Sequence, residues 1–153
     1  MIVEIDGWKT GITFSAAHII PSHGKCERLH GHVYGVRVRI YGKNEVMVVD
    51  FVKIKDVLRD IVSALDHHVL LPTKSPHIRI EQGDNVGVNV HGKHYVFPRE
   101  DVKLLDVVEC TAEQLAKYIL NTLMQRLGDV SVDRVELCVE EGPGQGAWAV
   151  YEG

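Results

Sequence analysis

The stretch that most constrains the fold is an alternation of side chains along residues 30–41. Even positions carry imidazole rings, a tyrosine ring or aliphatic groups, whereas Arg37 and Arg39 fall at odd positions. Successive side chains of a strand point to opposite faces, so a period of two predicts a strand with one buried face. Such a strand has to bury its apolar face against a second layer of structure.

Two later segments can supply that layer, because their apolar residues recur at the three-and-four spacing of an amphipathic helix. The first helix is predicted over residues 52–65, after Asp50, whose carboxylate can cap its first turn. The second is predicted to follow Thr111, which forms a capping box with Gln114 three residues later, and to end at Gly128.

Further strands are predicted at residues 8–20, 135–141 and 147–151, and residues 46–49 return the chain toward the first helix. The order strand, strand, helix, helix, strand, strand predicts an α+β fold: an antiparallel four-stranded sheet with two helices on one face. We expect residues 1–153 to form a single domain.

The two predicted helices are separated by more residues than a compact domain usually spends on a connection. We therefore predict an insertion at about residues 75–107. Apolar runs on either side of His91-Gly92-Lys93 indicate a hairpin within it, and residues 78–80 can add an edge strand. Its three histidines are expected on the surface: His77, His91 and His94.

Three histidines near the start of the chain have the spacing of metal ligands. His30 and His32 share one face of the predicted strand, and His18 ends a run in which Phe14 and Ala16 share its face. An antiparallel partner strand would add His18 as a third imidazole, and three neutral nitrogens with an open fourth position are typical of catalytic zinc. The alternative is three unrelated histidines, since the chain has nine.

Other polar residues are candidates for chemistry beside such a metal. Cys26, four residues before His30, adds a nucleophile or base. Asp66 can orient the imidazole of His67, although a histidine at a helix end is equally consistent with a contact to the helix dipole. Glu141 ends an apolar row, so its carboxylate either reaches solvent or meets a cationic or N–H-rich ligand.

Composition narrows the classes of function. Hydrophobic residues make up 45% of the 153 residues and charged residues 25%, and no apolar run approaches the length of a bilayer span. No signal segment is visible and the three cysteines form no C-x-x-C pattern, so we expect a cytoplasmic protein with neither disulfides nor thiolate zinc. A formal charge of −4 argues against nucleic-acid binding, but Lys25 and Arg28 could hold a small polyanion.

With these residues located, the chain resembles the 6-pyruvoyltetrahydropterin synthase and 6-carboxytetrahydropterin synthase family, which has the tunnelling fold. The resemblance spans nearly the whole chain except residues 75–107. Any one of its landmarks is weak, but together and in order they are specific: F-S-A-A-H (14–18), C-E-R-L-H-G-H (26–32), V-V-D-F (48–51), L-D-H (65–67), T-A-E (111–113) and the late strand with Glu141.

The resemblance implies roles for the candidate residues. It implies Zn²⁺ on the three histidines (His18, His30 and His32), with Cys26 as the thiolate that abstracts a proton and Asp66 and His67 as its partners in proton transfer. It also implies that a carboxylate of the late strand grips the pterin ring, assisted by groups near Thr111. Face parity with the buried row favours Glu141 over Glu140 for this carboxylate. Family members form trimers that stack into hexamers, with the site between subunits.

The implied reaction is that of a zinc-dependent carbon–oxygen lyase acting on 7,8-dihydroneopterin triphosphate. The C-x-x-x-H-G-H spacing resembles the branch that makes 6-carboxy-5,6,7,8-tetrahydropterin, acetaldehyde and triphosphate for deazaguanine nucleosides such as queuosine and archaeosine. A pyruvoyl product is one alternative. Another is 6-hydroxymethyldihydropterin, because Glu27 lies where a variant branch carries an acid instead of the cysteine. A zinc hydrolase and a non-catalytic pterin-binding oligomer are alternatives of a different class.

Overall fold

The computed structural model describes residues 1–153. Its strands and helices, in chain order, are β1 (Ile2–Asp6), α1 (Gly7–Thr10), β2 (Thr13–His18), a 3-10 turn (Gly24–Glu27), β3 (His30–Tyr41), α2 (Phe51–Ser63), β4 (His68–Pro72), β5 (Ile78–Gln82), β6 (Asn85–Val90), β7 (Lys93–Pro98), a second 3-10 turn (Arg99–Asp101), β8 (Val102–Leu105), α3 (Ala112–Leu127), β9 (Arg134–Glu141) and β10 (Gly146–Glu152).

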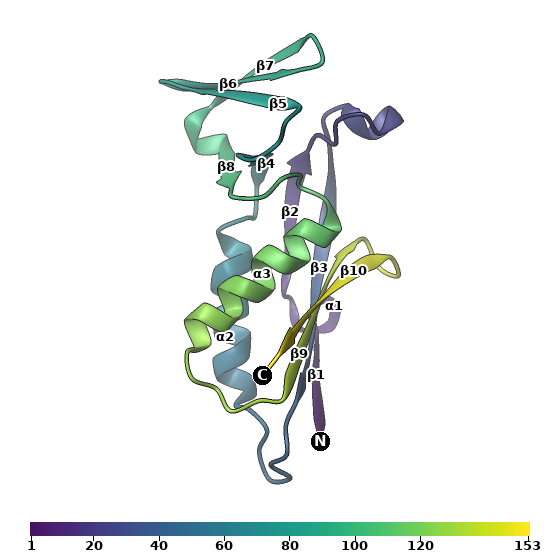
Figure 1. Ribbon diagram of the computed structural model, residues 1–153, viewed down its shortest axis with the longest axis vertical. Coiled ribbons are helices and arrows are strands. Elements are labelled where there is room, and N and C mark those ends of the chain that lie inside the picture. The colour runs from purple at the N-terminus through teal and green to yellow at the C-terminus, as the bar shows by residue number, and fades with distance from the viewer.

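A large sheet carries two helices on one face, and a small sheet lies at one end of the molecule (Figure 1). The large sheet has the order β10-β9-β3-β2-β4-β8, with β1 also paired to β3, and the small sheet has the order β5-β6-β7. Helices α2 and α3 pack side by side over the large sheet (Figure 1). The predicted α+β class, with two helices over one face, is therefore confirmed.

Strand β3 organises the large sheet as its alternation predicts. Its register with β2 sets His18 opposite His30 and Ala16 opposite His32, and β9 pairs along its other edge. The even-numbered side chains of β3 face the helices, where Tyr34 is fully buried and stacks on Phe14 with 4.8 Å between ring centroids. The same face thus carries the core in its middle and the histidines at one end.

The sheet differs from the prediction in strand number and direction. It has seven strands rather than four, and the pairings β2–β4 and β4–β8 are parallel. Strand β4, of sequence HVLLP, is a short continuous apolar run without alternation. Periodicity alone cannot distinguish such a run from other buried segments, so this strand was missed.

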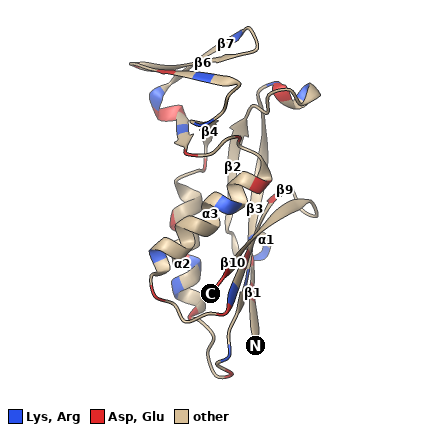
Figure 2. Ribbon diagram, viewed as in Figure 1, with Lys and Arg blue, Asp and Glu red and all other residues tan.

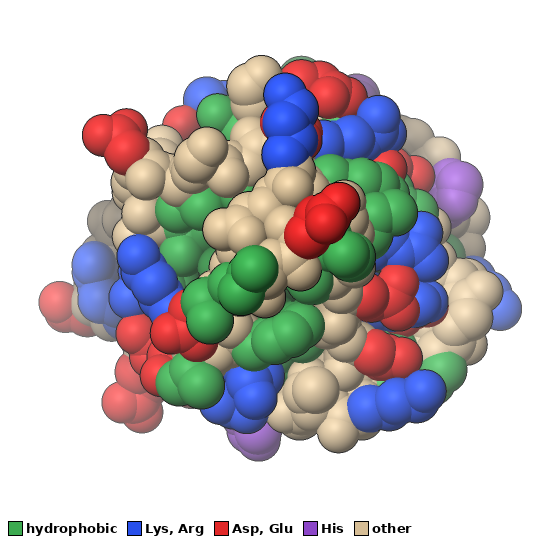
Figure 3. Space-filling model, turned by 90° about the horizontal axis from the view of Figure 1, so that it is seen from below, with side chains coloured by type: hydrophobic (Ala, Val, Ile, Leu, Met, Phe, Trp, Pro, Cys, Tyr) green, Lys and Arg blue, Asp and Glu red, His purple; other side chains and the backbone are tan.

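One predicted strand is shorter in the structure, and the segment that returns the chain to the first helix is a loop. The strand expected over residues 8–20 is shorter, because residues 7–10 form a helical turn that Asp6 caps and that Gly11 ends at a φ of 72°. Residues 46–49 form a loop at the end of the molecule that also holds the N-terminus, and Val46 is 95% exposed. Apolar side chains gather at this end (Figure 3), around a groove with Met1, Val3 and Phe51.

Both helices begin where their capping residues predict. The Asp50 carboxylate accepts a hydrogen bond from the N–H of Val52, and α2 ends two residues before the predicted boundary. Thr111 Oγ1 accepts from the N–H of Gln114, and α3 ends at Gly128, which has a φ of 66°. Capping residues are thus the most reliable boundary signals in this chain.

The predicted insertion contains the expected hairpin, β6 and β7, with β5 as a third strand. Its inner face forms a second small core with Leu71 of β4 and with Ile19, which directly follows β2. The core consists of Ile19, Leu71, Ile78, Val86, Val88 and Val90. The three histidines of the segment are exposed, as predicted.

Basic and acidic residues are interspersed along the helices and strands rather than separated onto two faces (Figure 2). None of the helices combines the length and the apolar character that crossing a bilayer requires.

Candidate metal centre

The three histidines predicted as ligands lie together at the end of the helix-covered face. Ring nitrogens of His18, His30 and His32 all lie within 4.8 Å of one another. The antiparallel pairing of β2 with β3 causes this convergence, because it sets His18 directly opposite His30. Two rings come from one strand and the third from its neighbour, as the spacing predicts.

Hydrogen bonds to the backbone orient two of these rings. His18 Nδ1 donates to the carbonyl of Cys110 at 2.7 Å, and His30 Nδ1 donates to the carbonyl of Arg28 at 2.6 Å. With the proton on Nδ1, each neutral ring presents the lone pair of its Nε2. The two Nε2 atoms lie only 2.9 Å apart, so their lone pairs repel unless a cation or a proton lies between them. This donor set fits a metal ion.

Burial keeps His18 in the neutral form that a metal ligand needs. Its side chain is almost fully buried, which lowers its pKa to about 4. The buried hydroxyl of Tyr34 lies 3.2 Å from His18 Nδ1. Burial raises the pKa of Tyr34, so the hydroxyl keeps its proton and remains a neutral member of the site.

A pocket of about 940 Å³ opens beside the three rings, and both Cys26 and Glu141 line it. This volume is in the range of small-molecule sites. Thr111 and the first residues of α3 form one wall, and Lys25 and Arg28 add positive charge near the thiol. The structure therefore brings together all three predicted ligands, the predicted base and both predicted substrate-binding residues.

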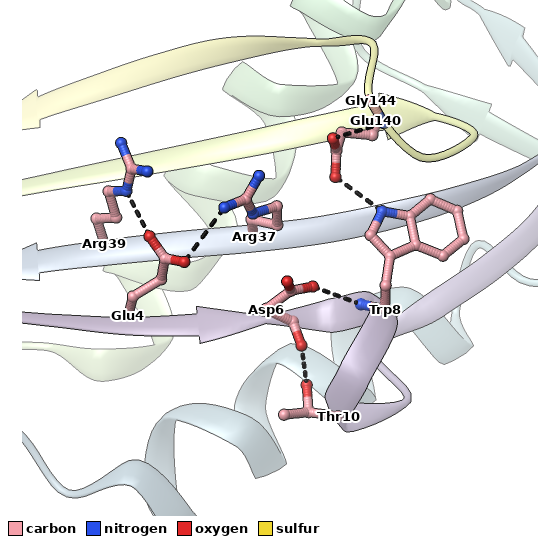
Figure 4. A network of polar contacts seen from close by, with 8 residues as sticks. All are labelled: Glu4, Asp6, Trp8, Thr10, Arg37, Arg39, Glu140 and Gly144. Carbon is pink, nitrogen blue, oxygen red and sulfur yellow. Dashed lines mark hydrogen bonds and ion pairs between the residues drawn. The ribbon is translucent and has the colours of Figure 1, made fainter.

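The two adjacent glutamates of β9 lie on opposite faces of the sheet. Glu141 lines the pocket, and its Oε2 lies 3.9 Å from His32 Nε2. Glu140 is 5% exposed, and it accepts hydrogen bonds from Trp8 Nε1 at 2.7 Å and from the N–H of Gly144 at 3.2 Å (Figure 4). Both carboxylate oxygens of Glu140 are thus engaged within the chain, whereas Glu141 faces the pocket.

Asp66 and His67 do not line this pocket. Asp66 Oδ2 lies 2.7 Å from His67 Nδ1, and Asp66 Oδ1 accepts from the N–H of Ser15. Burial of Asp66 opposes its ionisation, but the Ser15 N–H and the His67 ring outweigh it and lower its pKa. The His67 side chain is 83% exposed and its φ is 59°, a conformation that two contacts with Ser15 help to hold.

Sequence reasoning missed the groups that orient the three candidate ligands. Two of them are the backbone carbonyls of Cys110 and Arg28, which no side-chain pattern reveals. The third is Tyr34, which the sequence places in the buried row of β3. The only sequence signal for its place beside the histidines is that His32 and His30 occupy the next two positions of the same row.

Known proteins resemble this chain over most of its length. A model of the 6-pyruvoyl tetrahydropterin synthase family matches residues 8–153. A Methanocaldococcus jannaschii protein, provisionally named 6-carboxy-5,6,7,8-tetrahydropterin synthase, is 38% identical over 96% of this chain and 94% of its own length. The 6-carboxy-5,6,7,8-tetrahydropterin synthase of Haemophilus influenzae is 28% identical over 72% of this chain and 77% of its own length.

Solved structures resemble it over its whole length. A Plasmodium falciparum 6-pyruvoyl tetrahydropterin synthase superposes with a TM-score of 0.91 at 27% identity, covering 100% of this chain and 98% of its own. A Plasmodium vivax 6-pyruvoyltetrahydropterin synthase, with a catalytic glutamate replaced by cysteine, gives a TM-score of 0.91 at 28% identity and the same coverage. This chain belongs to the 6-pyruvoyl tetrahydropterin synthase family.

Proposed function

We propose that the protein is a zinc-dependent 6-carboxytetrahydropterin synthase. It converts 7,8-dihydroneopterin triphosphate and one water to 6-carboxy-5,6,7,8-tetrahydropterin, acetaldehyde and triphosphate, in the pathway to deazaguanine nucleosides such as queuosine and archaeosine. The main support is that three imidazoles, a thiol and a carboxylate line one pocket of substrate size. The names of the M. jannaschii and H. influenzae relatives favour the carboxy product.

The metal ligands in this proposal are His18, His30 and His32, and the bound metal is zinc. Three neutral imidazoles are a common catalytic set for Zn²⁺, which leaves a position for substrate oxygens. Bound there, the ion would supply Lewis acidity toward the hydroxyl groups of the substrate side chain. The remaining steps depend on groups of the protein.

Cys26 acts as the base that takes a proton from the side-chain carbon beside those hydroxyl groups. Its side chain is half-buried and lines the same pocket as the imidazoles. Lys25 and Arg28, which also line the pocket, match the negative charge of the triphosphate. Glu141 accepts hydrogen bonds from two N–H groups of the pterin ring, while groups near Thr111 contact the ring from the start of α3.

Asp66 and His67 serve the pocket of a neighbouring subunit. They form a close pair, and His67 is exposed, but neither lines the pocket of its own chain. A ring of subunits would bring them to another chain's Cys26, where His67 returns a proton to the reacting side chain. This arrangement requires the trimers and hexamers that the family resemblance implies.

Two features of the surface support such an assembly. Strands β10 and β8, at the two ends of the strand order of the large sheet, each pair with one neighbour only, so their outer sides can pair with other copies. Apolar side chains are exposed at the end that holds the N-terminus, among them Met1, Val46 and Met47 (Figure 3). We propose that three chains close a barrel and that two trimers stack.

The proposal extends to the cellular compartment. All three cysteines are free. Free thiols, one of them assigned here to catalysis, suit a reducing environment, so we propose a cytoplasmic enzyme.

The test is product analysis after incubation of the zinc-loaded protein with 7,8-dihydroneopterin triphosphate. Acetaldehyde and 6-carboxytetrahydropterin in equal amounts are expected. A pyruvoyl pterin or 6-hydroxymethyldihydropterin would assign the protein to another branch of the family. Binding of the substrate without any turnover would identify a pterin-binding oligomer instead, and release of phosphate alone would identify a hydrolase.

A further inference from the structure

Glu27 follows Cys26 directly, yet the two side chains lie in different surroundings. Cys26 lines the metal pocket, whereas Glu27 does not. The Glu27 carboxylate accepts from the N–H of Ser22 at 2.9 Å, and it contacts two residues of the insertion, His91 Nδ1 at 2.9 Å and Lys93 Nζ at 3.5 Å. Its side chain is only 18% exposed. Glu27 therefore joins the turn that carries Cys26 to a segment more than sixty residues away in sequence.

The hairpin turn of the insertion is shaped to make this contact. His91 and Gly92 connect β6 to β7 with φ values of 44° and 82°. Positive φ at both central residues is the geometry of a type I′ hairpin turn, which matches the twist of the strands. The turn leaves His91 and Lys93 facing the Cys26 turn, where His91 Nδ1 lies within hydrogen-bond distance of the Glu27 carboxylate and Lys93 forms an ion pair with it.

The Cys26 turn is also attached through its backbone and through the small core. The N–H of Ile20 donates to the carbonyl of Cys26 at 2.9 Å. Ile19, one residue earlier, packs in the same small core as Val88 and Val90 of β6. The insertion therefore supports the segment around Cys26 by apolar packing on one side and by the Glu27 contacts on the other.

The low pKa of Glu27 fits a structural contact better than proton transfer to or from the substrate. The Ser22 N–H, followed by His91 and Lys93, lowers the pKa of Glu27 to about 2. A carboxylate whose pKa lies this far below neutral pH is a poor proton donor and a weak proton acceptor, and all of its close partners here are donors within the chain.

We infer that Glu27 is a positioning residue, whose carboxylate ties the Cys26 turn to the His91–Lys93 turn of the insertion and thereby fixes the Cys26 sulfur over the metal pocket. The inference rests on the proposed function in assigning the reacting sulfur to Cys26. It gives the insertion a role in the reaction, and it assigns Glu27 a role other than that of a catalytic acid.

The experiment compares Glu27→Ala, Glu27→Gln and His91→Gly with the matched control His94→Ala. Gly at position 91 accepts the positive φ and removes the side chain that contacts Glu27. His94 is a histidine of the same hairpin that bonds Asn89 and does not contact the Cys26 turn. Three quantities are measured on each protein: bound zinc, the rate of Cys26 alkylation by iodoacetamide without substrate, and kcat with KM. Cys110 and Cys138 are buried, so alkylation reports mainly on Cys26.

If Glu27 positions the turn, Glu27→Ala and His91→Gly keep their zinc. Their Cys26 is alkylated at least about threefold faster, because the turn opens more often. Their kcat falls by at least about tenfold, because the sulfur is less often in position. Glu27→Gln has an alkylation rate and a kcat between those of these two variants and the wild type, because its side-chain oxygen can still accept a hydrogen bond from the N–H of Ser22. The double variant Glu27→Ala/His91→Gly is no worse than Glu27→Ala alone, because the two residues share one contact.

The inference is overturned by the following result. Both Glu27 variants lose turnover or make a different product, while His91→Gly keeps the wild-type alkylation rate and the wild-type kcat. That result would make Glu27 a catalytic group. Failure of the proposed function is distinguishable: the wild type would show no turnover, while the substrate-free alkylation rates would still report whether the tether exists.

Discussion

The Nε2 atoms of His18 and His30 lie 2.9 Å apart, while the Nδ1 atom of each ring donates to a backbone carbonyl. In this arrangement the two lone pairs face each other. The fold holds them there through the β2–β3 register, so the repulsion is relieved when a cation binds. The site is therefore preorganised for a metal, and metal binding should stabilise the fold.

Removal of the metal should lower the melting temperature. A ligand present at about a hundredfold excess over its Kd stabilises the native state by about 2.7 kcal/mol, which corresponds to roughly 5–10 °C for a chain of this size. Thermal unfolding of chelator-treated protein, before and after zinc is added back, measures this. His30→Ala should unfold at one temperature under both conditions, and a zinc-dependent shift retained in that variant would mean that the stabilising metal binds elsewhere.

Cys26→Ala should separate metal binding from chemistry. We expect wild-type zinc content, because the three imidazoles remain, and a fall in turnover of about 10³-fold, because the proton-abstracting group is gone. Metal analysis and product formation on the same preparation test both parts. Turnover within a few-fold of the wild type would remove Cys26 from the mechanism.

The two adjacent glutamates should respond differently to the same substitution. Glu141→Gln replaces one acceptor of the pterin N–H groups by a donor, so kcat/KM should fall about 10–100-fold with little change in stability. Glu140→Gln should instead cost about 1–3 kcal/mol of unfolding free energy, because one of its two donors, Trp8 or Gly144, loses its acceptor. Measuring kcat/KM and the free energy of unfolding in denaturant for both variants tests this difference. The reverse pattern would make Glu140 the pterin anchor.

Subunit mixing tests whether the site is shared between chains. Cys26→Ala and His67→Ala are each expected to be inactive, but oligomers formed by unfolding and refolding them together should regain activity, since some sites then receive an intact residue from each chain. Cys26→Ala mixed with His30→Ala is the matched control and should stay inactive, because those two residues line one pocket. Equal recovery in both mixtures, or in neither, would contradict a site completed by a neighbouring subunit.

The local signals in the sequence predicted much of this site because the relevant distances are short along the chain. Period-two alternation placed His30 and His32 on the core face of β3, and parity along β9 separated Glu141 from Glu140. Capping chemistry at Asp50 and Thr111 located both helix starts. In each case a few neighbouring residues determine the geometry.

What the sequence did not predict depends on contacts between distant segments. Strand β4 has no alternation because it lies in the interior of the sheet, paired in parallel with β2 and β8. The tether from Glu27 to His91 depends on how the insertion docks, and the Cys110 carbonyl that orients His18 lies 92 residues from it. No local pattern encodes these relationships.

The most direct test of the account is an anomalous-difference map at the zinc absorption edge from crystals of active protein. We predict one peak per chain, bound by His18, His30 and His32, in the pocket that Cys26 lines. Active protein with no peak among those rings, or with its zinc held by other residues, would contradict it.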